Sequence, residues 1–280
     1  MKIKDTRKKY NLGLALSGGG AKGFAHVGVF KFLEECNLTP GIISGTSAGA
    51  LAGLLFADGH SAADIETIFT GKDFSEFAKI QLPKTGLFDN KRFQAFLREH
   101  IQAKHFEELK TPLVVIATDL DKGICREFRS GPIIEPVVAS CSIPIIFSPV
   151  EIDGSHYVDG GLFRNFPVSN IRQECDRVIG VNVSPLIAQK YKQTIWGIAE
   201  RSYHYMFRAN TLEDRALCDI LIETKDAAGY KTFDLENVNQ ITNIGYEAAL
   251  QAFDKFIEDQ SLVVKILATQ KDRQNTENNK

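Results

Sequence analysis

The chain has 280 residues, of which 44% are hydrophobic and 24% are charged, so it holds enough apolar material for the core of an ordinary globular protein. Its 33 Lys and Arg residues against 35 Asp and Glu residues leave a net charge of -2, which argues against a nucleic-acid partner. The five scattered cysteines include no C-x-x-C pair, which argues against a disulfide framework and a metal site and favours a reducing, cytoplasmic setting. The basic N-terminus precedes an apolar run too short for a signal peptide, and we expect no membrane span.

Strand-like and helix-like apolar patterns alternate along the chain. The predicted strands are short apolar runs next to turn residues, at 12–16, 41–44, 113–117, 124–128, 150–152, 157–158, 177–183 and 220–223. The predicted helices have apolar residues at helical spacing, at 24–35, 50–57, 62–69, 91–101, 133–140, 168–174, 186–217 and 240–257. Ser61 should cap the third of these helices, and the prolines within 143–149 predict an extended segment there.

This alternation predicts an α/β fold in three layers (α/β/α) around a largely parallel central sheet. We expect a single domain over residues 1–268, whose helical C-terminal part begins at residue 186. The polar residues 269–280 are expected to fray. No internal repeat or low-complexity linker divides the chain.

The run Gly45-Thr46-Ser47-Ala48-Gly49 lies between a predicted strand and a predicted helix. This is the pattern of a nucleophile elbow, a turn so sharp that only small neighbours such as Gly45 and Gly49 let the two backbones pass. The hydroxyl of Ser47 would project from the turn, beside the free N–H groups of the helix N-terminus. The alternative is an ordinary buried serine in a small-residue turn, because matches of five residues are common by chance.

The run Gly18-Gly19-Gly20-Ala21-Lys22-Gly23 follows a strand and opens a helix, as the dinucleotide-binding fingerprint G-x-G-x-x-G does. A dinucleotide site also needs an acidic residue at the end of the second strand, whereas this chain has residues 44–47 (SGTS) there, and Asp58 lies beyond the next helix. The second interpretation is an oxyanion hole, formed by backbone N–H groups of the first three glycines. Lys22 would add positive charge nearby, or would simply be a solvated lysine at the start of the helix.

A nucleophilic serine needs a group that accepts its proton. An α/β-hydrolase triad Ser47-Asp159-His204 has the right order, but His204 falls within a predicted helix rather than on a loop after a strand. Asp159 is the better candidate, because it ends a strand and because Gly160 and Gly161 allow close approach of the backbone. A carboxylate with a pKa near 4 is a weak base, and burial in a water-poor site would raise that pKa.

At these residues the chain resembles the patatin-like phospholipase family. The resemblance rests on 17–23, Gly45–Gly49, Ala139–Pro144 with Phe147 and Pro149, and Asp159–Gly161 with Asn165 and Pro167. It covers about residues 10–185 and implies a patatin-like fold with a Ser–Asp dyad and no catalytic histidine. By this resemblance Ser47 is the nucleophile, Asp159 is the base and Gly18–Gly20 form the oxyanion hole. Lys22, Gly23, Gly160 and Gly161 support them.

The resemblance implies a serine acyl hydrolase of the phospholipase A or lysophospholipase type, which cleaves carboxylic esters of lipids through an acyl-enzyme without a metal or cofactor. Its partners would be the lipid substrate and, transiently, a membrane surface; the sequence leaves the oligomeric state open, a homodimer included. A dinucleotide-binding protein and a non-catalytic lipid-binding module are the competing classes. The Phe-rich segment 74–88 would either cover the site and receive acyl chains or pack in the core.

Overall fold

The computed structural model describes residues 8–72, 79–80, 86–185, 187, 191, 193–232 and 235–277. Within them, an eight-stranded sheet has the order β10-β9-β1-β2-β5-β8-β7, and β6 also pairs with β5. Its strands are β1 (Tyr10–Leu16), β2 (Ile42–Thr46), β5 (Leu113–Asp119), β6 (Ile124–Phe128), β7 (Val150–Ile152), β8 (Ser155–Asp159), β9 (Cys175–Asn182) and β10 (Ile220–Glu223). From β10 to β5 the pairing is parallel, whereas β6, β7 and β8 pair antiparallel, so the predicted α/β fold is confirmed with a mixed sheet.

Helices surround this sheet. They are α1 (Phe24–Glu35), α2 (Ala48–Asp58), α3 (Ala62–Phe69), α5 (Lys91–His100), α6 (Ile134–Ser140), α7 (Ser169–Arg172), α8 (Ile195–Ala209), α9 (Leu212–Arg215) and α10 (Val238–Glu277). Two short 3-10 turns, η1 (Gly20–Gly23) and η3 (Gly160–Leu162), lie beside the predicted site. The predicted cap of α3 is a reciprocal capping box, in which Ser61 Oγ accepts the Asp64 N–H at 3.1 Å and the Asp64 carboxylate accepts the Ser61 N–H at 3.0 Å.

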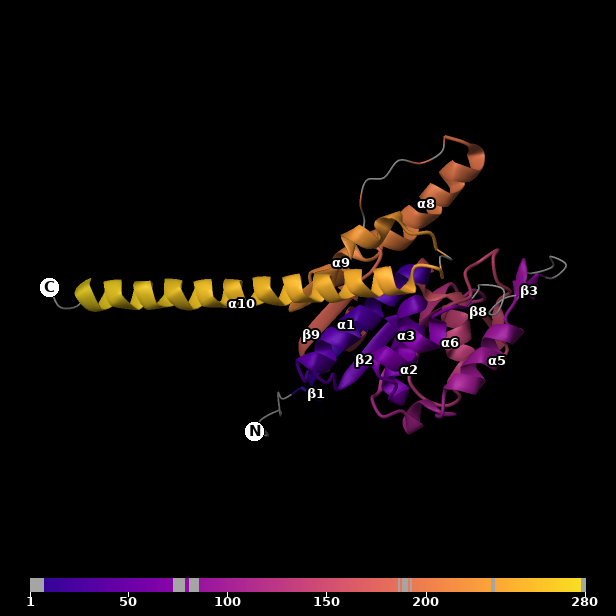
Figure 1. Ribbon diagram of the computed structural model, residues 1–280, viewed down its shortest axis with the longest axis horizontal. Coiled ribbons are helices and arrows are strands. Elements are labelled where there is room, and N and C mark those ends of the chain that lie inside the picture. Colours follow the sequence, from indigo (N-terminus) through magenta and orange to yellow (C-terminus); the bar gives the residue numbers. More distant parts are fainter. Residues whose placement is uncertain are drawn as a thin grey trace.

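The two faces of the sheet are covered unequally. Leu14 and Leu16 of β1 belong to the larger core, whereas Ala15 between them belongs to the smaller one, as expected from the alternation of side chains along a strand. The larger core packs against α1, α2, α3 and α10 (Figure 1). The smaller core is covered by residues 166–171, which include most of α7. The second helical layer is therefore thinner than the first.

Helix α10 crosses α1 at a point where the two backbones touch. A Cβ on Gly28 would contact the carbonyl of Thr242, and a Cβ on Gly245 would contact the carbonyl of Ala25. The predicted helix 240–257 lies within α10, which continues to Glu277 and extends away from the rest of the molecule (Figure 1). Its last turns include most of the polar segment 269–280.

Two further predicted helices differ in length from those observed. The predicted helix 186–217 consists of α8 and α9, which are separated at Asn210 and Thr211, where the Asn210 side chain bonds to the loop after β8. The predicted helix 168–174 is the single turn α7, because the chain enters β9 directly afterwards.

The proline-flanked segment 143–149 is not extended as predicted. The Phe147 N–H donates to the Ile143 carbonyl at 2.9 Å and closes a turn. Pro144 fits near the start of this turn because proline has no backbone N–H that would need a partner. Ile145 in this turn has a φ of 74°, a backbone conformation that β-branched residues rarely adopt. Most of the predicted cover 74–88 lies outside the described residues.

Candidate active site

Ser47 has the backbone geometry of a nucleophile elbow. It lies between β2 and α2 with a φ of 52° and a ψ of -122°, and only 7% of it is exposed. A Cβ on Gly45 would contact the Gly49 carbonyl, and a Cβ on Gly49 would contact the Leu16 carbonyl. Because no side chain fits at either position, the small residues predicted to flank the elbow are needed for the strand and the helix to pack this closely.

Ser47 and Asp159 meet because of the way β2 and β8 share one edge of β5. Thr46, at the end of β2, pairs with Ile116, and Asp159, at the end of β8, pairs with Ala117, the next residue of β5. The strand β6 occupies the other edge of β5. Since β2 runs parallel and β8 antiparallel to β5, their C-terminal ends face each other, and Ser47 follows directly on Thr46.

The Ser47 side chain and the Asp159 carboxylate line the same small cavity, where Ser47 is close enough to stabilise the charged form of Asp159, and the Gly161 N–H donates to Asp159 Oδ1 at 2.8 Å. Asp159 is only 1% exposed. Burial raises the pKa of Asp159 to about 7, although the neighbouring Ser47 side chain and the bond from Gly161 act in the opposite direction by stabilising the carboxylate. A carboxyl with this pKa exchanges a proton readily near neutral pH.

The glycine loop lies on the other side of Ser47. The Gly18 N–H donates to the Asn165 carbonyl at 2.9 Å, so it is occupied within the protein. The N–H groups of Gly19 and Gly20 have no acceptor among the described residues. Both glycines line a cavity of about 60 Å³ together with Ser47 and Asp159. Of the three predicted oxyanion-hole glycines, two are therefore available to a bound oxygen.

Lys22 is buried, with 6% exposure, and lines the same small cavity. The interpretation of Lys22 as a solvated lysine is therefore wrong, because η1 carries it inward rather than into solvent. Gly23, which ends η1, lies against α2, where a Cβ would come within 2.6 Å of the Ala48 Cβ. A Cβ on Gly160 would contact the Ile116 carbonyl of β5, and a Cβ on Gly161 would contact the Phe207 ring of α8.

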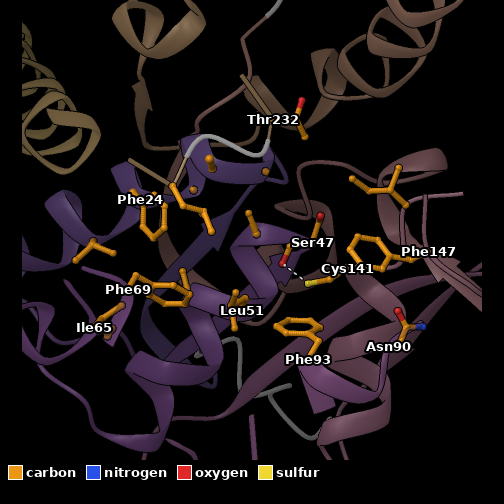
Figure 2. A pocket seen from close by; sticks show the side chains of 18 residues that line it. Phe24, Ser47, Leu51, Ile65, Phe69, Asn90, Phe93, Cys141, Phe147 and Thr232 are labelled. Carbon is orange, nitrogen blue, oxygen red and sulfur yellow. Dashed lines mark hydrogen bonds between the residues drawn. The ribbon is translucent and has the colours of Figure 1, made fainter. Parts of the chain in front are cut away.

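A second, apolar cavity of about 150 Å³ adjoins the first, and Gly20, Ser47, Ile143 and Thr232 line both. Aromatic and aliphatic side chains dominate its wall, and Cys141 and Asn90 add polar atoms (Figure 2). In this view Ile65 and Phe69 lie at the end away from Ser47, whereas Phe147 and Cys141 lie beside it. Ser47 thus borders both the small cavity, which the glycine loop and Asp159 line, and the larger apolar one.

Ser140 and Cys141, at the end of α6, hold the Ser47 backbone. Ser140 Oγ accepts the Ser47 N–H at 2.8 Å and donates to the Ile116 carbonyl at 2.6 Å, while the Cys141 thiol donates to the Ser47 carbonyl at 3.3 Å. Burial, together with the charge of Asp159, raises the pKa of the Cys141 thiol well above its usual range, so this thiol is a poor nucleophile. The sequence analysis did not predict either role. The feature that could have indicated them is the pair of polar side chains, a hydroxyl and a thiol, at the end of an apolar helix.

Five of the six histidines have described side chains, and none of these contacts Ser47 or Asp159. His26 Nε2 lies 2.9 Å from the Ser17 carbonyl, and burial lowers the pKa of His26 to about 4. His156 pairs with Asp121 in an exposed position. The remaining three bond to groups elsewhere, namely His60, His100 and His105. For His204 only the backbone, within α8, is described, so its predicted side-chain role lies outside the described residues.

The dinucleotide interpretation lacks its acidic partner. Asp58 lies at the C-terminal end of α2, where its carboxylate accepts the N–H groups of Gln102 and Ala103 at 2.9 and 3.0 Å. No acidic residue stands at the end of β2, where a ribose would need one. Among the described residues, no group of three or more His, Cys, Asp or Glu side chains could hold a metal ion.

The fold and the site define a class: an α/β protein with a serine at a strained strand-to-helix turn and a buried carboxyl that lines the same cavity. Residues 14–171 match the family described as patatin-like phospholipase. This match spans more than half of the chain, and the chain belongs to the patatin-like phospholipase family. The resemblance inferred from the motifs is confirmed.

Similar proteins are mostly longer. Patatin-like phospholipase domain-containing protein 7 of Rattus norvegicus is 27% identical over 88% of this chain and 21% of that protein. An uncharacterized NTE family protein of Mycobacterium tuberculosis is 30% identical over 62% of this chain and 47% of that protein. The chain thus spans less than half the length of these curated relatives. The crystal structure of VipD from Legionella pneumophila matches 89% of this chain and 67% of VipD with a TM-score of 0.56 at 16% identity, which shows a shared fold.

A membrane span would be a long apolar helix in the described part of the chain. None of its helices combines the length and the apolarity that crossing a bilayer requires. The five cysteines are free thiols.

Proposed function

We propose that the protein is a serine acyl hydrolase that cleaves carboxylic esters of lipids through the dyad of Ser47 and Asp159. The observation that carries the proposal is that Ser47, strained at its elbow, and the buried carboxyl of Asp159, whose pKa is about 7, line the same small cavity. A base poised near neutral pH can accept a serine proton without a histidine. Membership of the patatin-like phospholipase family supports a lipid ester as the substrate.

In the proposed mechanism, Ser47 Oγ attacks the ester carbonyl while Asp159 accepts its proton. The N–H groups of Gly19 and Gly20 donate to the oxyanion of the tetrahedral intermediate, and Lys22 adds positive potential to the same cavity. Asp159 then returns the proton to the leaving alkoxide, which leaves an acyl group on Ser47. A water molecule, deprotonated by Asp159, attacks this acyl-enzyme, and the acid product and Ser47 are released.

The acyl chain of the substrate would occupy the apolar cavity. Among the described residues, its wall has no charged side chain, and Ser47 is part of this wall, so a chain bound there would bring its carbonyl carbon to the hydroxyl. The alcohol part, such as a phospholipid or lysophospholipid headgroup, would lie on the polar side with the glycine loop. This arrangement favours hydrolysis of the phospholipase A or lysophospholipase type.

We further propose that the turn 143–149 touches the lipid surface. Ile145 is 78% exposed, and Leu87 beside it is 43% exposed. The two are joined by the bond from the Leu87 N–H to the Ile145 carbonyl at 3.1 Å. Ile143 and Phe147, from the same turn, line the apolar cavity, so the exposed apolar surface continues into the site. The free cysteines support a reducing compartment such as the cytoplasm.

The deciding experiment combines hydrolysis of a soluble short-chain p-nitrophenyl ester with labelling by a fluorophosphonate. The wild-type protein should hydrolyse the ester and take one label on Ser47, and Ser47→Ala should lose both. His204→Ala should keep most activity under the dyad and lose nearly all of it under a triad. Vesicle binding without any acyl-enzyme would overturn the proposal in favour of a lipid-binding module. Labelling of Ser47→Ala on another serine would remove Ser47 from the mechanism.

A further inference from the structure

Asn210, between α8 and α9, reaches back to the loop that follows Asp159. Its side-chain Oδ1 accepts the Asn165 N–H at 2.9 Å. Its Nδ2 donates to the carbonyls of Gly161 and Leu162, at 2.8 and 3.3 Å. Both ends of the amide are therefore bonded to backbone groups of one loop. Asn210 lies outside residues 14–171, which match the family.

The first of these contacts bears on the proposed base. Gly161 donates its N–H to Asp159 Oδ1 at 2.8 Å, and the carbonyl of the same Gly161 accepts from Asn210. A residue held at both its N–H and its carbonyl keeps one orientation, so Asn210 fixes the group that orients the Asp159 carboxylate. Phe207 of α8 packs so closely on Gly161 that a Cβ would not fit between them.

The second contact bears on the glycine loop. The Asn165 carbonyl accepts the Gly18 N–H at 2.9 Å, while the N–H of Asn165 is held by Asn210. Asn165 is 3% exposed, and its side-chain Oδ1 is close enough to Gly18 to exclude a Cβ there. Through Asn165, the amide of Asn210 is therefore connected to the loop that carries the proposed oxyanion-hole donors.

Asp214 of α9, four residues after Asn210, bonds to the same loop. Asp214 is fully buried, and its carboxylate accepts the Ser169 N–H at 2.6 Å and pairs with Arg164 at 2.8 Å. The Arg164 carbonyl in turn accepts the Thr46 hydroxyl at 2.8 Å, next to Ser47. The loop 160–169 is thus bonded to β2 on one side and to the α8–α9 corner on the other.

We propose that Asn210 is a positioning residue that holds the Asp159 loop and the glycine loop in register around Ser47. The proposal rests on the proposed function, and it assigns a role in hydrolysis to the C-terminal helical part of the chain. Loss of the amide leaves Asp159 and Ser47 in place but lets the Gly161 and Asn165 peptides turn. The reacting groups then lose alignment, which lowers kcat more than substrate binding.

The test uses the full chain with Asn210→Leu, which keeps the size of the side chain but not its hydrogen bonds. The matched control is Asn170→Leu, which removes an amide bonded to Glu127 at 2.7 Å on the half-buried turn α7. For a soluble short-chain p-nitrophenyl ester, kcat of Asn210→Leu should fall about 10- to 100-fold, as expected for the loss of one or two hydrogen bonds to the aligning loop, with KM changed less than about threefold. The control should retain wild-type kcat.

A pH profile separates positioning from a general loss of structure. Without an oriented Gly161 N–H the Asp159 carboxylate is less stabilised, so the acid limb of kcat/KM should move to higher pH in Asn210→Leu. Among the described residues, the other titratable groups around Asp159 are the Cys141 thiol and the Lys22 ammonium, which every variant keeps. A merely structural role would lower the yield or the melting temperature and leave the acid limb in place.

Wild-type kcat and an unmoved acid limb in Asn210→Leu overturn the inference while leaving Ser47-dependent hydrolysis standing. If Asn210→Leu does not fold, Asn210→Asp serves instead, because it keeps the acceptor for Asn165 and loses only the donor to Gly161 and Leu162. A wild-type kcat in that variant overturns the inference equally. If Ser47→Ala hydrolyses the ester as well as the wild type does, the proposed function fails, and the positioning role fails with it.

Discussion

Ser47 and Asp159 approach each other from strands that run in opposite directions along the same edge of β5. Neither residue is near the other in sequence, and their meeting depends on β2 ending beside Ile116 and β8 ending beside Ala117. Shortening β8 by one residue would turn the side chain of its last residue to the other face of the sheet. The dyad is therefore a consequence of strand register, and Ser140 reinforces it by bonding to both Ser47 and Ile116.

The pH dependence of hydrolysis should follow the titration of Asp159. The carboxylate is the proposed base, and the pKa of Asp159 is about 7, so kcat/KM should rise with pH through a limb centred near 7 and level off above it. Asp159→Asn should lower kcat about 10³-fold or more and abolish this limb. Stopped-flow or steady-state assays on a soluble ester between pH 5 and 9 measure it. If Asp159→Asn stays partly active and keeps the same acid limb, that limb belongs to another titratable group.

The stability of the protein should also depend on the Asp159 proton. In the unfolded chain an aspartate has a pKa of about 4, whereas in the folded protein the pKa of Asp159 is about 7. Between these pH values the folded state keeps a proton that the unfolded state has released, so this group lowers the free energy of unfolding as pH rises. Asp159→Asn should therefore be stabilising at pH 8, by roughly 1–3 kcal/mol, and nearly neutral at pH 4.5.

Urea unfolding at the two pH values checks this expectation. Asp153→Asn is the control, because Asp153 lies in an exposed turn of the same hairpin. An Asp159→Asn variant that is less stable than the wild type at pH 8, by more than at pH 4.5, contradicts the expected sign.

The crossing of α1 and α10 should tolerate no added methyl group. Gly28→Ala places its Cβ against the Thr242 carbonyl, a backbone group that cannot rotate away, so α10 must shift. We expect a loss of about 1–3 kcal/mol in the free energy of unfolding, as in other overpacked contacts. Gly229→Ala, at a glycine with open space around it, should change stability by about 0.5 kcal/mol or less. Equal stabilities of the two variants would show that the helices do not touch there.

Local patterns were sufficient for most strands of the sheet and for placing Ser47 and Asp159 at the ends of two of them. Ser47 lies in a motif that requires a strand before it and a helix after it, and Asp159 ends a hairpin strand that a glycine turn opens. The positions of Ser140 and Asn210 could not be read in the same way. Their contacts join segments far apart in sequence, Ser140 to Ser47 and Asn210 to Gly161, and nothing in the residues around them encodes the partner. The same holds for the burial of Lys22.

The length of the apolar cavity should set the preferred acyl chain. Ile65 lies at the end away from Ser47 (Figure 2), so Ile65→Phe should shorten the space and lower hydrolysis of long-chain esters relative to short-chain ones. A shift of about 10-fold in the ratio of kcat/KM for hexadecanoyl over butanoyl esters is expected, because two or three buried methylenes lose their contacts. Leu97→Phe, a buried leucine of α5 that does not line the cavity, controls for overpacking alone. If both variants change this kcat/KM ratio equally, the cavity does not determine the preferred length of the acyl chain.

Ile145 offers a test of the proposed lipid contact in which stability and activity should change in opposite directions. An isoleucine at a φ of 74° is strained by about 1–2 kcal/mol, and Ile145→Gly removes this strain but makes the unfolded chain more flexible, for a net gain of about 0.5–1 kcal/mol. The same change removes a side chain that is 78% exposed and lines neither cavity. Ile145→Gly should therefore melt at a slightly higher temperature, hydrolyse a soluble butanoyl ester at the wild-type rate and bind phosphatidylcholine vesicles more weakly, with slower release of fatty acid. Ile257→Ala, which shortens another exposed isoleucine on α10, should behave as the wild type in all four measurements. If Ile145→Gly binds vesicles and releases fatty acid as the wild type does, the Ile145 side chain does not contact the lipid surface.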